Sequence, residues 1–230
     1  MNHDTLPATP LRLNSADLDH IGTLDVTGAE VLVGDPCYYD DYGTFLAQTV
    51  TCPAGAGSAE CYVQRDPHSS VTTRLVVLFT GVPGQVEAAR PAGYLPVDGA
   101  QMSVIDARRY HTQWQRRTAA VLARYVHASG AHLDHPGDFR RYDQPITSQG
   151  GRSMTELIAT GEWTETPVPG QQDFSFPGLC AARDASPLDA AVMDRAAFIT
   201  GSGYGDGRYV LEHLLDRRGV TVGLNVTFAE

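Results

Sequence analysis

The side chains that could do chemistry gather in three short stretches rich in aspartate and glycine. These corners are residues 34–39 (GDPCYY), 96–101 (PVDGAQ) and 201–209 (GSGYGDGRY). Each adjoins an apolar run that predicts a β-strand. Glycine and aspartate at strand ends fix unusual backbone angles and leave a carboxylate facing outward. Corners that meet at one end of a sheet would form a site, whereas separate corners would be turns only.

A carboxylate cluster is the first chemistry that these corners suggest. Asp35, Asp98 and Asp206 together would hold a divalent cation, because hard cations prefer several oxygen ligands, or would act as acid and base. The alternative is that each aspartate caps its own turn, which is the commoner use of an Asp-Gly pair. Asp40 and Asp41 add acidity beside the first corner, but their spacing is not that of an EF-hand.

A nucleophilic cysteine is the second chemistry that these corners suggest. Cys37 follows a proline and precedes two tyrosines. A catalytic thiol needs a histidine or cationic neighbour that lowers its pKa, and His213, on the predicted strand beside the third corner, is the best candidate. The plainer alternatives are an inert thiol and a half-buried strand histidine. The four cysteines contain no C-x-x-C spacing, so zinc and redox motifs have little support.

A binding pocket is the third possibility that these corners suggest. Its candidate ligand-binding residues are Asp35, Tyr38, Asp98, Gln101, Gly205, Asp206, Gly207 and Tyr209. The glycines of the third corner do not predict a phosphate loop, because a strand rather than a helix follows them. We expect the ligand to be a small molecule or a partner protein.

The composition describes an acidic chain. It has 230 residues and a formal net charge of -10, which argues against nucleic-acid and anionic-membrane binding. All 17 basic residues are arginine, so Schiff-base and phosphate-loop chemistry that needs lysine is excluded. No apolar run is long enough to span a membrane, and the N-terminus lacks the pattern of a secretory signal. We therefore expect a cytoplasmic protein.

Apolar alternation predicts strands in both halves of the chain. Strands are expected over residues 22–33 with a break at 27–28, over 45–52, 61–64, 71–80 and 102–105, and as a hairpin over 209–215 and 220–228. Helical spacing predicts a helix from Asp106, as its N-cap, to Gly130. Further elements are a loop over 131–152, a helix over 153–161 that opens with a capping box, an irregular segment over 167–177, and a helix beginning at Ser186.

These elements predict an α+β fold. Its core is a predominantly antiparallel, sandwich-like β-sheet, with a helical insertion and a C-terminal β-hairpin. The expected organisation is a loose arm over residues 1–20 followed by one domain over 21–230, which the insertion interrupts at about 106–195.

Four motifs follow one another along the chain. They are Gly22-Thr23-Leu24 leading to Asp35-Pro36, Cys52-Pro53 leading to Tyr62-Val63, Val97-Asp98-Gly99 followed by Asp106, and Ser202 to Tyr209 with a hairpin that closes on Phe228. This order resembles an uncharacterised bacterial family, domain of unknown function 4241. Small phage proteins with Asp-Pro-Cys-Tyr and Gly-Asp-Gly-x-Tyr are distantly similar.

The resemblance covers mainly residues 22–106 and 196–230. The second corner departs from the family pattern, because Asp98 and Gly99 lack the usual intervening small residue. The resemblance implies the set of motifs and no particular mechanism.

Two functional hypotheses follow. The first is a binding module whose three corners form a pocket for a small ligand or a partner protein, and the lack of a complete catalytic signature favours it. The alternative is a hydrolase that uses a carboxylate-held metal or Cys37. A structural role without a pocket would leave the corners far apart.

Overall fold

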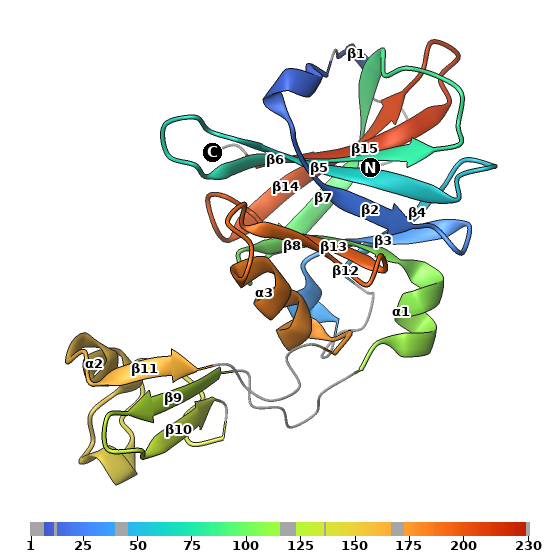
Figure 1. The fold of residues 1–230 in the computed structure, drawn as a ribbon. Helices are drawn as coiled ribbons and strands as arrows, with labels where there is room; N and C mark the ends of the chain where they lie inside the picture. The colour runs from blue at the N-terminus through green and yellow to red at the C-terminus, as the bar shows by residue number, and fades with distance from the viewer. Residues whose placement is uncertain are drawn as a thin grey trace. The chain divides into compact units, whose positions relative to one another are not determined.

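The chain divides into two compact units, shown as ribbons in Figure 1. The computed structural model describes residues 7–11, 13–39, 46–115, 123–135, 137–166 and 173–228. The larger unit comprises residues 1–114 and 182–230, and the smaller unit comprises residues 115–181.

A seven-stranded sheet forms one layer of the larger unit. Its strands, in spatial order, are β1 (Thr9–Pro10), β7 (Ala88–Val97), β14 (Gly207–Leu215), β15 (Thr221–Thr227), β6 (Thr72–Thr80), β5 (Ser58–Arg65) and β2 (Asp19–Asp25). Every neighbouring pair is antiparallel. β14 and β15 form the predicted C-terminal hairpin, in which Val210 faces Thr227.

A five-stranded antiparallel sheet forms the other layer. Its order is β12 (Ala190–Met193), β13 (Ala197–Gly201), β8 (Gln101–Asp106), β3 (Glu30–Gly34) and β4 (Gln48–Thr51). All six residues of β8 are buried, as are all five of β13. These central strands therefore show a continuous run of buried residues rather than an alternation.

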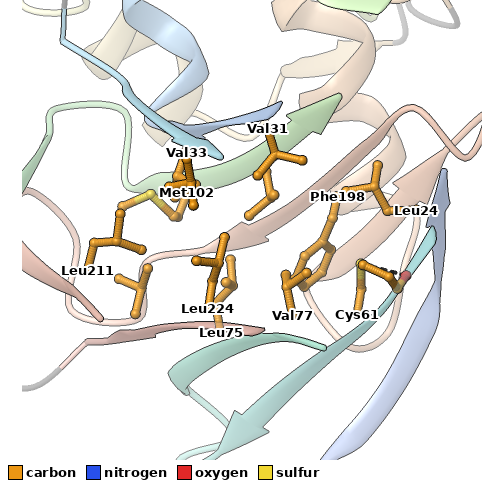
Figure 2. Packing of buried hydrophobic residues seen from close by; sticks show 14 of the residues in the cluster. Leu24, Val31, Val33, Cys61, Leu75, Val77, Met102, Phe198, Leu211 and Leu224 are labelled. Carbon is orange, nitrogen blue, oxygen red and sulfur yellow. Dashed lines mark hydrogen bonds between the residues drawn. The ribbon is translucent and has the colours of Figure 1, made fainter. Parts of the chain in front are cut away.

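The two sheets share one hydrophobic core. The five-stranded sheet contributes Val31, Val33, Met102 and Phe198, and the seven-stranded sheet contributes Leu24, Cys61, Leu75, Val77, Leu211 and Leu224 (Figure 2). In β5 and β6 every second side chain points into this core, as the pleat of a strand requires. Burial of each large apolar side chain contributes about 1.5–3 kcal/mol. The predicted α+β fold with a sandwich-like antiparallel core is thus confirmed.

The helix predicted over residues 106–130 is correct only at its beginning. Asp106 caps α1 (Ala107–Gln113), and its side chain accepts a hydrogen bond from the Arg109 amide at 2.8 Å. The helix ends at Gln113, and the later residues of the predicted helix form β9 (Ala123–His127). Residues 116–122, which include the two apolar positions Val121 and Leu122, lie outside the described residues.

The smaller unit has its own sheet and its own core. β9 lies between β10 (His132–His135) and β11 (Trp163–Thr166), and α2 (Met154–Ala159) completes the unit. Its core contains Ala123, Tyr125, Leu133, Phe139, Ile146, Met154, Leu157 and Trp163. The predicted capping box is present at Ser153 and Glu156. The segment 131–152 is not all loop, because it contains β10 and the 3-10 helix η4 (Thr147–Gln149).

The helix predicted from Ser186 is also wrong. Residues 185–189 form turns, and the helix precedes them as α3 (Phe176–Asp184). Asp189 has φ +51°, which no helix accommodates, and the Ser186 hydroxyl accepts a hydrogen bond from the Leu188 amide at 3.3 Å. A serine before a proline initiates turns as readily as helices. Of the predicted irregular segment, residues 167–172 lie outside the described residues.

The described part of the N-terminal arm is ordered against the seven-stranded sheet. β1 pairs with the beginning of β7, and a 3-10 helix, η2 (Ser15–Asp17), follows. Leu11, Leu13 and Leu18 pack on the sheet face that points away from the sandwich core. None of the helices in the described ranges has the length and apolarity that a membrane span requires.

Candidate functional site

The three corners lie at the same end of the five-stranded sheet. Residues 98–100 carry the chain from β7 to β8, and residues 202–206 carry it from β13 to β14, so both connect one sheet with the other. The first corner follows β3 and contains the 3-10 helix η3 (Pro36–Tyr38). Because Gly34 faces Ser103 and Gln101 faces Gly201, the end of β3, the start of β8 and the end of β13 are neighbours.

Asp35 joins the first corner to the second. One of its carboxylate oxygens accepts a hydrogen bond from the Cys37 amide at 2.9 Å. The other accepts from the amides of Asp98 and Gly99, at 2.9 Å and 2.6 Å. The residue is 1 % exposed. A buried carboxylate that has three backbone donors is strongly held, because hydrogen bonds to charged groups contribute about 1.5–3 kcal/mol each.

The second corner is also bonded to the third. The Ala100 amide donates to the Asp206 carboxylate at 3.3 Å, and the Ser202 amide donates to the Ala100 carbonyl at 3.0 Å. Within the third corner, the Ser202 and Tyr209 hydroxyls both donate to the Gly205 carbonyl, at 2.7 Å and 2.9 Å. The corners that are remote in sequence therefore form one hydrogen-bonded structure.

Acidic groups surround Tyr38 on this structure. Burial raises the pKa of the Tyr38 phenol above its ordinary value, and the negative charge of Asp98 raises it further, with smaller contributions from Asp35 and Asp206. Asp98 and Asp206 are exposed, whereas Tyr38 is partly buried. The corners thus present two exposed carboxylates beside a phenol that stays protonated at neutral pH. We call Tyr38, Asp98 and Asp206 the corner surface.

The other predicted ligand-binding residues mainly support the three corners, and we call this hydrogen-bonded and buried support, which includes Asp35, the frame. Gln101, the first residue of β8, is buried, and Gly207 is the first residue of β14. The Tyr209 ring is buried against Phe228, with their centroids 5.1 Å apart and their planes at 89°. Gly205 contributes the carbonyl that holds the third corner.

The structure does not bring Cys37 and His213 together. His213 lies on β14 beyond Gly207, which puts it about 20 Å along the strand from the third corner at ~3.3 Å per residue. Cys37 lies next to the Asp35 carboxylate, whereas thiolate formation needs a cationic neighbour. All four cysteines lie in the described ranges, and none is joined in a disulfide.

The described residues provide no set of side chains for the predicted metal site. In the part of the chain that the structure describes, no group of three or more His, Cys, Asp or Glu side chains is arranged to hold a metal ion. Both oxygens of Asp35 are occupied by backbone amides. Asp40 and Asp41 lie outside the described residues. A bound divalent cation therefore stays a prediction from the sequence alone.

Sequence reasoning missed an exposed aromatic and cationic group near the corners. The Arg208 guanidinium lies over the Tyr94 ring, 5.2 Å from its centroid, and Tyr94 and Tyr204 are each 49 % exposed. Arg208 is the second residue of β14 and faces Pro96 on β7. Only the cross-strand register could have revealed this pair, and the sequence does not specify that register.

Comparisons with protein-family models, with curated proteins and with solved structures found no match. The resemblance to the family named above therefore rests on the motifs alone.

Proposed function

We propose that this protein is a binding module whose corner surface recognises a small ligand or partner protein that carries a cationic group. The observation that supports this proposal is the buried Asp35 carboxylate, which ties the first corner to the second. A surface held in this way loses little conformational entropy on binding, so its exposed carboxylates are ready for a partner.

The charge of the corner surface favours a cationic group. Asp98 and Asp206 are exposed on adjacent connections, and the whole chain carries a net charge of -10. Tyr204 lies within the third corner and Tyr94 faces Val210, the residue that follows it, and both are exposed. Tyrosines are frequent among the residues that dominate binding energy. The hydrolase alternative has no comparable support, because both oxygens of Asp35 accept backbone amides and His213 lies about 20 Å along β14 from the third corner, at ~3.3 Å per residue.

A titration with two matched peptides tests the proposal. The probes are acetyl-Gly-Arg-Gly-amide and the same peptide with neutral citrulline in place of arginine. We expect the arginine peptide to shift the amide resonances of residues 98–100 and 202–206 in ¹⁵N spectra, and the citrulline peptide to bind more weakly. Because exposed ion pairs contribute about 0.2–1 kcal/mol each, the D98N/D206N double variant should lose about two- to thirtyfold in affinity.

Asp194→Asn is the matched control. Asp194 lies in the turn between β12 and β13, at the opposite end of β13 from Gly201, and the substitution removes one carboxylate charge there, as Asp98→Asn or Asp206→Asn alone does at the corner surface. It should leave the titration unchanged. Equal affinity for the two peptides, or an equal loss in the control variant, would show that the corner surface does not recognise cationic groups.

A further inference from the structure

The seven-stranded sheet has a second apolar face, which points away from the sandwich core. Val76, Ala89 and Leu214 are buried on it, and Leu11, Leu13, Leu18, Tyr62, Leu78 and Val86 pack around them while remaining partly exposed. The N-terminal arm crosses this face, where the Leu11 amide donates to the Glu87 carbonyl at 3.0 Å. The arm covers the face only in part.

A cavity of about 710 Å³ lies on this face, between the arm and the segment that precedes β7. Leu13 and Leu18 line it from the arm, Leu78 from the sheet, and Val86 from the preceding segment. These four side chains are only half-buried, so a ligand would remove apolar surface from water. The volume falls within the range of small-molecule sites, about 300–1,000 Å³, which are mostly apolar with a few placed polar groups.

Glu87 is the only charged side chain in the described lining of this cavity. Its backbone is fixed, because its amide donates to the Leu215 carbonyl at 2.9 Å and its carbonyl accepts from Leu11. Among the described residues, none donates a hydrogen bond to its carboxylate or forms an ion pair with it. We propose that this cavity binds a small apolar amine, with the apolar body against the leucines and the ammonium group on Glu87.

The charge of Glu87 favours an amine over other amphipathic molecules. A carboxylate ligand would bring a second negative charge to it, and a neutral ligand would gain no ion pair from it. An adjoining hollow of about 370 Å³ shares Gly84, Gln85 and Glu87 with the cavity and also contains Asp216, Arg217 and Arg218. Asp216 offsets the charge of Arg218, because the Arg218 Nε atom lies 3.2 Å from the Asp216 carboxylate.

The cavity is independent of the corner surface. Glu87 directly precedes β7, whereas the second corner follows Val97 at the other end of the same strand. Failure of either proposal therefore leaves the other untouched, and the two titrations report on different amide resonances.

Three probes that share one apolar body test the proposal: phenylbutylamine, phenylbutanol and phenylbutyrate. In ¹⁵N spectra of the whole chain, the amine should shift the amides of residues 85–87 and 13–18. It should bind about two- to fivefold more tightly than the alcohol, which is the effect of one ion pair at an exposed carboxylate, and the carboxylate should bind most weakly. Absence of amine binding, or equal affinity for amine and alcohol, would overturn the proposal.

Two substitutions separate the charge from the cavity. Glu87→Gln should reduce amine affinity to that of the alcohol, while Glu30→Gln, which removes an exposed charge on β3, should change nothing. Val86→Trp should occupy part of the cavity and weaken the binding of every probe. If Val86→Trp does not fold, the Glu87→Gln comparison still decides the outcome, because Glu87 is exposed and makes no side-chain contact that folding needs. Unchanged amine affinity in Glu87→Gln would overturn the assignment.

Discussion

Asp35 shows how one side chain can define a site without taking part in its chemistry. Its carboxylate is buried and receives three backbone amides from two segments that are remote in sequence. Asp98 and Asp206 also lie in glycine-containing corners that follow or precede strands, and yet they are exposed. Residue type and local spacing therefore identified the three aspartates but could not tell the frame from the surface.

The exchange Asp35→Asn should destabilise the protein by about 2 kcal/mol, because an amide loses the negative charge and turns one acceptor into a donor that faces backbone N–H groups. Asp98→Asn, at an exposed position, should change the free energy of unfolding by less than about 0.5 kcal/mol. Urea unfolding of the two variants measures the difference. Similar values would mean that Asp35 does not hold the corners together.

The third corner contains two glycines with positive φ that make a matched pair. Gly203 has φ +68° and Gly205 has φ +91°. A side chain at Gly205 would meet open space, whereas one at Gly203 would collide with the Thr72 carbonyl oxygen at the start of β6. Gly205→Ala should therefore lower the free energy of unfolding only by the backbone cost of about 1–2 kcal/mol, and Gly203→Ala by clearly more. Equal losses in thermal or urea unfolding would contradict the close approach to β6.

At the scale of elements, alternation predicted β4, β5, β6, β8 and the C-terminal hairpin but missed β7 and β13, and helical spacing predicted only the beginning of α1 and missed α3. The C-terminal hairpin was predicted from the alternation of Val222, Leu224 and Val226, and all three side chains are buried in the structure. The helix from Asp106 failed because Tyr125 fits both a helical period and a strand, and a single sequence cannot decide between them. The meeting of the corners depended on strand order and register, which local patterns do not encode.

The turn of the C-terminal hairpin predicts a pH dependence of stability. Amides of Val220 and Arg218 donate to the Asp216 carboxylate and hold its pKa below the ordinary value of 3.8. Because the folded-state pKa is depressed, the stabilisation is fully present above the unfolded-state pKa and is lost as the pH falls through the folded-state value. Asp216→Asn should thus be less stable than wild type at pH 7, and the difference should shrink below about pH 4.

Urea unfolding at a series of pH values measures this difference for both proteins. Asp66→Asn is a second test of the same sign, since amides of Ser69 and His68 also lower the pKa of that carboxyl. A gap between Asp216→Asn and wild type that stays constant with pH would refute the contribution of the charge.

At the scale of the whole molecule, the two units have hydrophobic cores that share no residue among those described. The sequence predicted an insertion within one domain, and the structure describes a compact unit over residues 115–181 with a sheet of its own. Composition could not show this, because short strands such as β10 and β11 carry too few apolar residues to stand out from a loop.

Separate cores predict separate responses to cavity-forming substitutions. Leu157→Ala should destabilise the smaller unit by about 2–5 kcal/mol, as is usual for a fully buried leucine. Hydrogen exchange measured by mass spectrometry should then accelerate in β9 and α2 and stay unchanged in β5 and β6. Leu224→Ala, in the larger core, should give the reverse pattern. A loss of protection in both units from either substitution would show that they unfold together.

The hydrogen bonds of Asp35 have a consequence for backbone protection. Amide hydrogens in connecting segments normally exchange with solvent quickly, since they lack partners that only global opening would break. Those of Cys37, Asp98 and Gly99 are bonded to a carboxylate that is itself closed off from water. They should exchange about as slowly as hydrogens in the middle of β8, so that in a deuterium experiment two bends in the chain would behave as though they were part of the sheet.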